Sequence, residues 1–152
     1  MTRLLGIDLG TRRVGLAVAD TQSALVRPLA TIRRSNPERE RETLSRIIAE
    51  QAATEVVVGL PLNMDGSEGA QAALTRAWAE CVLAPLGLPL RLRDERLTSE
   101  RAEERLRAPR RGRTGGAPSP ARRAAHRATI DRQSAGLILE AELAARAQAP
   151  SR

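Results

Sequence analysis

The sequence is poor in the residues that form disulfides and soft metal sites. Its 152 residues include one cysteine, Cys81, and one histidine, His126. A single thiol excludes an intramolecular disulfide and a site built from several cysteines, and its helical surroundings predict a core thiol. No apolar stretch reaches the roughly 18 residues of a membrane span, and the chain opens directly into a strand-like run without a leader. We therefore expect a soluble, cytoplasmic protein without membrane contact.

Aromatic residues and lysine are also scarce. There is no phenylalanine or tyrosine, and the one aromatic residue, Trp78, lies in an alanine-rich helical pattern where we expect it to pack rather than stack on bases. Lysine is absent, so all 25 basic residues are arginine, against 18 acids and a formal charge of +7. This excess favours a nucleic-acid partner, although an arginine-rich genome would account for part of it.

Arginine is concentrated toward the C-terminal third. Eight arginines and no acid lie between Arg105 and Arg127, and residues 108–120 collect glycine, proline and serine, which predicts a mobile loop. The loop is either a phosphate-binding arm or a solvated spacer. The arginines that we expect to bind nucleic acid are Arg12, Arg110, Arg111, Arg113, Arg122 and Arg123.

Periodicity and turn residues predict one α/β domain over residues 1–150. Strands are expected at about 3–9, 13–19, 24–33, 55–60 and 90–94, and helices at about 36–53, 70–84, 98–107 and 121–147. Pro28 suggests that the third strand is an edge or carries a bulge. Three antiparallel strands followed by alternating helices and strands predict a mixed five-stranded sheet with helices on both faces.

Acidic residues are expected at the ends of the predicted strands. Asp8 interrupts the apolar run Leu4–Leu9, where an unpaired carboxylate is costly. Asn63 and Asp65 follow the fourth strand, Glu95 follows the fifth, and these ends share one edge of the sheet, where ligands gather. We expect these side chains to converge there.

Three acids are the candidate metal ligands. Asp8, Glu95 and Asp131, the last on the C-terminal helix, could together hold Mg²⁺ or Mn²⁺, as phosphodiester chemistry often requires. Each also has a structural explanation. Asp8 could be a turn residue, Glu95 could pair with Arg96, and Asp131 could stabilise the helix dipole.

Four sequence blocks together resemble the YqgF/RuvX family, which belongs to the RNase H-like superfamily of nucleases and resolvases. The blocks are Gly6–Asp20, Val56–Gly66, Asp94–Ser99 and Ile130–Ala135, in the family's order. The resemblance implies an RNase H-like fold and catalytic, metal-binding acids at Asp8, Glu95 and Asp131, with Asp94 beside them. Family members often have lysines before the last helix, where this chain has arginines and His126.

The resemblance implies a metal-dependent nuclease, with maturation of the small-subunit ribosomal RNA precursor as the expected role. The alternatives are resolution of Holliday junctions and a non-catalytic nucleic-acid-binding factor in ribosome assembly. We expect structured RNA, or else branched DNA, as the partner of a monomer or weak homodimer. The Gly6–Thr11 segment also looks like the first phosphate loop of the actin and sugar-kinase superfamily, but those enzymes need two such domains, and 152 residues hold one.

Overall fold

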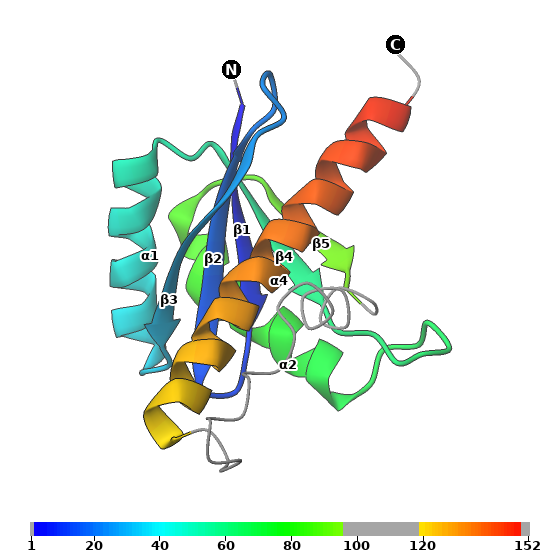
Figure 1. The fold of residues 1–152 in the computed structure, drawn as a ribbon. Coiled ribbons are helices and arrows are strands. Elements are labelled where there is room, and N and C mark those ends of the chain that lie inside the picture. Colours follow the sequence, from blue (N-terminus) through cyan, green and yellow to red (C-terminus); the bar gives the residue numbers. More distant parts are fainter. Residues whose placement is uncertain (1, 96–118, 150–152) are drawn as a thin grey trace, which may run out of the picture.

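One mixed sheet forms the centre of the protein (Figure 1). The computed structural model describes residues 2–95 and 119–149, apart from the side chains of 124–132. The strands are β1 (Arg3–Leu9), β2 (Arg13–Asp20), β3 (Val26–Arg33), β4 (Glu55–Leu60) and β5 (Leu90–Asp94), in the order β3-β2-β1-β4-β5. The first three are antiparallel neighbours, whereas β4 and β5 run parallel to β1. The predicted sheet is confirmed.

Pro28 occupies a position that tolerates its missing N–H. Strand β3 is at the edge of the sheet, and its register with β2 shifts between Leu16 and Ala17, where Ala17 pairs with Pro28. Because proline cannot donate to a strand ladder, it is confined to edges and irregular positions. The edge or bulge that Pro28 predicted is present.

Helix α1 (Pro37–Gln51) begins where its sequence predicts. The Asn36 side chain accepts a hydrogen bond from the backbone N–H of Arg39 at 2.9 Å, and Pro37 occupies the first turn. Both features stabilise a helix start, because the cap satisfies a free N–H group and proline has none to satisfy. The helix ends at Ala52, which adopts a left-handed conformation with φ 54°.

The helix predicted over 70–84 is divided into three parts. Helix α2 (Ala70–Trp78) continues into a wider π-helical turn (Ala79–Leu83) and a 3₁₀ turn (Ala84–Leu86). Pro85 explains the break, because its ring cannot donate to the Cys81 carbonyl four residues earlier. That carbonyl accepts a hydrogen bond from Arg41 instead.

Cys81 is exposed, so the prediction of a core thiol was wrong. Cys81 is not among the buried side chains of this segment, which are Ala72, Thr75, Trp78, Ala79, Val82 and Leu83. Trp78 is buried, as expected for a packing residue.

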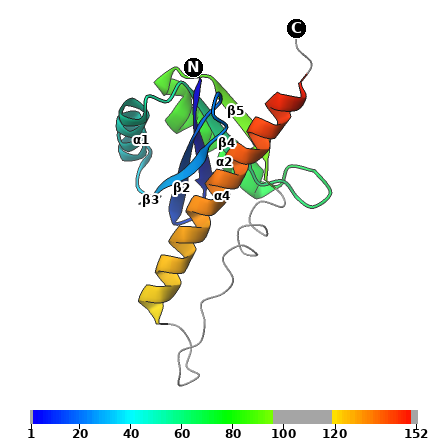
Figure 2. The same cartoon turned by 45° about the horizontal axis from the view of Figure 1, so that its top comes forward.

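The two faces of the sheet are covered by different helices. Leu5, Ile7 and Leu16 belong to a core with α1 and α2, whereas Leu4 and Val57 belong to a second core with the long helix α4 (Pro120–Gln148). Figure 2 shows α1 and α4 on opposite sides of the strands. Alternate residues of each central strand therefore face different helices, as the predicted layers require.

Helix α4 packs unusually close to β1. A Cβ atom on Gly6 would lie 2.6 Å from Cγ of Leu139 and 3.0 Å from the carbonyl oxygen of Ala135. Helix α4 thus approaches the sheet closely at Ala135, and this approach depends on the glycine in the facing strand. The helix predicted over 98–107 and most of the loop predicted over 108–120 lie outside the described residues. Within the described segments, every helix is too short or too polar to cross a membrane.

Candidate active site

Two of the predicted acids, Asp8 and Glu95, are brought together at the carboxyl edge of the sheet. Asp8 follows Ile7 in β1, and because side chains alternate, it faces α4 while Ile7 faces α1. Glu95 comes directly after β5, and its backbone N–H donates to the carbonyl of Leu60 at 3.2 Å. This hydrogen bond extends the pairing of β4 with β5 and holds Glu95 beside the end of β4.

Gly59 provides the space for the Glu95 side chain. A Cβ atom on Gly59 would overlap Oε2 of Glu95 and would lie 2.5 Å from Cδ1 of Ile138. Strand β4 lies between β1 and β5, so the Glu95 carboxyl group crosses the bare backbone of β4 on its way toward Asp8. Gly59 was not predicted from the sequence as part of the site, although a glycine inside a β-branched strand is a signal of close approach.

The electrostatics of this pair favour a bound proton or cation. Burial, the charge of Asp8, the hydrogen bond with Asp8 and the charge of Asp94 together raise the pKa of Glu95 to about 9. Among the described residues, Glu95 Oε2 has no hydrogen-bond partner although it is buried. Two carboxyl groups this close cannot both ionise at low cost unless a positive charge joins them. The donor set and the unpartnered oxygen fit a hard divalent cation.

The third predicted acid, Asp131, lies on α4, and its side chain is outside the described ones. Arg146 of α4 contacts Glu55 at the start of β4, whereas Ile138 lies over Gly59 near the end of β4. Helix α4 therefore runs opposite to β4, and residues before Ile138 lie toward the carboxyl edge. Among the described side chains, no three of histidine, cysteine, aspartate and glutamate gather closely enough to hold a metal.

Asn63 and Asp65 form hydrogen bonds within their own loop. Asp65 accepts from the backbone N–H of Ser67 at 2.9 Å and from its hydroxyl at 2.5 Å, and Asn63 donates to that hydroxyl at 3.0 Å. Among the described residues, Asp65 does not join Asp8 and Glu95 in a group of three acids that could hold a metal. The residues that interact at this edge include Asp8 and Glu95, with the charge of the exposed Asp94 nearby.

The predicted nucleic-acid-binding arginines fall into described and undescribed groups. Arg12 is exposed in the β1–β2 turn, and Arg122 and Arg123 are exposed in the first turn of α4, after the Ser119 cap. The other members, which are outside the described residues, are Arg110, Arg111 and Arg113.

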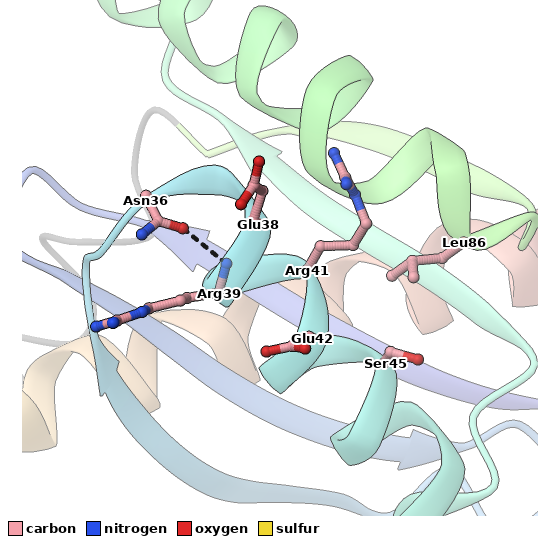
Figure 3. A pocket seen from close by; sticks show the side chains of 7 residues that line it. All are labelled: Asn36, Glu38, Arg39, Arg41, Glu42, Ser45 and Leu86. Atoms are coloured by element: carbon pink, nitrogen blue, oxygen red, sulfur yellow. Dashed lines mark hydrogen bonds between the residues drawn. The ribbon is translucent and has the colours of Figure 1, made fainter.

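A separate hollow of about 590 Å³ lies beside the first turns of α1 (Figure 3). It is lined by side chains of both charges, among them Glu38, Arg39, Arg41 and Glu42, together with Leu86. Helix α1 covers the face opposite to α4, so this hollow is not part of the Asp8–Glu95 site.

Curated relatives match most of the chain. The chain is 43% identical over 104 residues to a "Putative pre-16S rRNA nuclease" from Chloroflexus aggregans, covering 68% of this chain and 73% of the relative. It is 47% identical over 105 residues to a protein of the same name from an Anaeromyxobacter species, with coverages of 69% and 77%. A protein of that name from Chloroflexus aurantiacus is 38% identical over 149 residues, with coverages of 98% and 91%.

The fold has a counterpart among solved structures. Thermus thermophilus RuvC, solved in complex with a Holliday junction substrate, matches with a TM-score of 0.54 at 18% identity, covering 97% of both chains. This likeness supports the RNase H-like fold. The model of the family described as "RuvX: Holliday junction resolvase" matches residues 2–145. With nearly the whole chain matched, the protein belongs to the RuvX family.

Proposed function

We propose that this protein is a nuclease that hydrolyses phosphodiester bonds with divalent metal ions held by Asp8, Glu95 and Asp131. The observation that carries the proposal is the buried Oε2 of Glu95, which has no hydrogen-bond partner among the described residues and belongs to a carboxyl group beside Asp8. An oxygen in such a place is costly unless it receives a proton or a cation. Magnesium and manganese are the expected ions because both favour carboxylate ligands.

Asp131 completes the proposed ligand set. Residues 131, 135 and 138 share one stripe of a helix, because their spacing is close to whole turns. Ala135 and Ile138 of this stripe pack on Gly6 and Gly59. The direction of α4 supports this role, because the helix runs from Ala135 back toward residue 131 and the strand end that carries Asp8.

The reaction requires only a few contributions from the residues of the protein. A bound divalent ion would supply a water of lowered pKa and neutralise the charge that develops on the phosphate. Asp8 and Glu95 present their carboxylate oxygens on the face of the sheet that α4 covers, and Gly59 leaves room for the Glu95 side chain there. Exposed arginines such as Arg12 bind the flanking phosphates. Water is the nucleophile, so no covalent enzyme intermediate is required.

The substrate that we propose is the precursor of small-subunit ribosomal RNA. Relatives 36–47% identical to this chain carry the name "Putative pre-16S rRNA nuclease". The second candidate is resolution of Holliday junctions, which the description of the family names. A resolvase makes two symmetric cuts and therefore needs two sites held in a defined dimer, whereas one site can trim RNA.

The test is cleavage by the purified protein with Mg²⁺ or Mn²⁺, using precursor ribosomal RNA and a four-way DNA junction side by side. Asp8→Asn is the inactive variant, and Asp20→Asn is its matched control because Asp20 ends β2 and caps the backbone of Gln22 at 2.7 Å. We expect metal-dependent RNA cleavage that only Asp8→Asn abolishes. A stable dimer that nicks junctions symmetrically and leaves RNA intact would establish the second candidate. Tight RNA binding without any cleavage would indicate a non-catalytic assembly factor.

A further inference from the structure

Arg34 holds the β1–β2 turn at two carbonyl groups. Its Nη1 donates to the carbonyl of Gly10 at 2.8 Å, and its backbone N–H donates to the carbonyl of Arg12 at 2.9 Å. The turn itself is closed by a 2.8 Å hydrogen bond from the Gly10 N–H to the Arg13 carbonyl. Arg34 follows β3, so the tip of one hairpin is held by a residue from outside it.

The Arg34 guanidinium is held in turn by a buried glutamate. Its Nε donates to Oε2 of Glu40 at 2.8 Å, and the other oxygen of Glu40 accepts a hydrogen bond from the Trp78 indole at 3.3 Å. Glu40 is only 2% exposed although it lies in the first turn of α1. A continuous chain of hydrogen bonds thus runs from the end of α2 through α1 to the β1–β2 turn.

The stability of the fold alone does not account for this series of hydrogen bonds. Ion pairs that are largely buried lose much of their attraction to desolvation, and well-packed apolar side chains serve stability equally well. What the guanidinium adds is direction, because its planar fork binds Glu40 and Gly10 at fixed angles. The segment that it fixes is next to the proposed chemistry. Asp8 is two residues before Gly10, and the exposed Arg12 lies in the turn.

We propose that Arg34 and Glu40 are positioning residues for the Asp8 end of the active site. They hold the β1–β2 turn so that the Asp8 carboxylate faces Glu95 and Arg12 faces the phosphate of the substrate. The proposal rests on the nuclease function for its consequence in catalysis, whereas its effect on the turn can be measured without substrate.

The test compares two variants of α1 and its surroundings. The double variant Arg34→Met/Glu40→Gln removes the ion pair without leaving a buried charge, and the glutamine oxygen can still accept from Trp78. The control is Ile47→Ala, which weakens the packing of α1 against the same core but removes no hydrogen bond between Arg34, Glu40 and Trp78. Four quantities are measured for each protein: the melting temperature, the exchange rate of the Gly10 amide by NMR, the dissociation constant for Mn²⁺, and kcat against KM.

For the double variant we expect Gly10 exchange about tenfold faster, Mn²⁺ binding at least about threefold weaker and kcat at least about tenfold lower, with a smaller change in KM. The control should change these values less than about twofold even where its melting temperature falls as far. Equal effects of the two variants, or unchanged Gly10 exchange and Mn²⁺ affinity in the double variant, would show that the hydrogen bonds of Arg34 and Glu40 only support the fold.

A replacement variant and the result for the wild-type protein keep the test decisive. If the double variant does not fold, Arg34→Lys replaces it, because lysine keeps the charge beside Glu40 and lacks the fork that also reaches Gly10. Faster Gly10 exchange and weaker Mn²⁺ binding in Arg34→Lys support the proposal, and wild-type values overturn it. Absence of cleavage by the wild-type protein would refute the proposed function, while Gly10 exchange and Mn²⁺ affinity would still decide the positioning role.

Discussion

The Oε2 atom of Glu95 lies over Gly59, in the space that a Cβ atom on Gly59 would occupy. The position of the Glu95 side chain, at the end of β5, therefore depends on the absence of a side chain at Gly59 in the neighbouring strand β4. Since Ile138 of α4 closes the same space from above, the Glu95 carboxyl group has few positions available other than the one beside Asp8. A single glycine thus links the packing of α4 to the geometry of the acids.

Gly59→Ala should lower both the activity and the stability of the protein. The added methyl group must displace Glu95 and Ile138, which we expect to cost about 1–3 kcal/mol in the free energy of unfolding and to lower kcat by about tenfold or more. Cleavage rates and urea unfolding check this. Gly136→Ala is the control, because its Cβ would meet only Cγ1 of Val26 at an ordinary 3.6 Å. Normal kcat in Gly59→Ala would place the essential carboxylate elsewhere.

The stability of the metal-free protein should fall with rising pH. The pKa of Glu95 is raised from an ordinary 4.5 to about 9 by burial and by Asp8, so the folded state binds a proton that the unfolded state releases. This contribution is complete below about pH 4.5 and is lost progressively as the pH rises through 9. Urea unfolding in EDTA at pH 6 and pH 8 measures the change, with Glu95→Gln as the reference. Equal pH dependence in both proteins would contradict the raised pKa.

Asp8→Asn should abolish cleavage while nucleic-acid binding stays equal or becomes a few times tighter. The substitution keeps the volume and removes a negative charge that binds metal and repels phosphate. Binding to precursor RNA by fluorescence anisotropy and cleavage in Mg²⁺ provide the two measurements. A well-folded Asp8→Asn protein with wild-type cleavage, free of contaminating nuclease, would remove Asp8 from the catalytic set.

Local sequence patterns predicted most of the fold because the strands carry strong signals. The strand expected at about 55–60 and the helix expected at about 36–53 are both present, as β4 and α1. Asp8 was conspicuous because an acid is costly in an apolar strand. These features are decided by neighbours in the sequence, and the structure agrees with them.

Features that depend on contacts between distant segments could not be predicted. Glu40 resembles any acid in the first turn of a helix, and only its contacts with Arg34 and Trp78 explain its burial. The exposure of Cys81 likewise depends on which face of its helical segment packs on the core, and the buried Trp78 and Val82 define that face. The role of Asp131 as a third ligand stays a prediction, since its side chain is outside the described part of the chain.

The arginines of the loop before α4 should supply much of the affinity that is independent of nucleic-acid sequence. Removing one arginine–phosphate interaction lowers the slope of log affinity against log salt by about 0.7 on single strands and about 0.9 on duplexes. Replacing Arg110, Arg111 and Arg113 by alanine should therefore flatten the slope by about 2 to 3 if all three bind phosphate. Binding titrations between low and physiological salt measure it.

The control for this prediction removes the same charge elsewhere. Alanine at Arg39, Arg46 and Arg76 also lowers the net charge by three, but these exposed arginines lie on α1 and α2, on the face opposite to α4. If the loop binds the substrate, its variant loses salt dependence while the control keeps most of it, because screening weakens distant charges. Equal slopes in the two variants would mean that affinity follows total charge and that the loop is a solvated spacer.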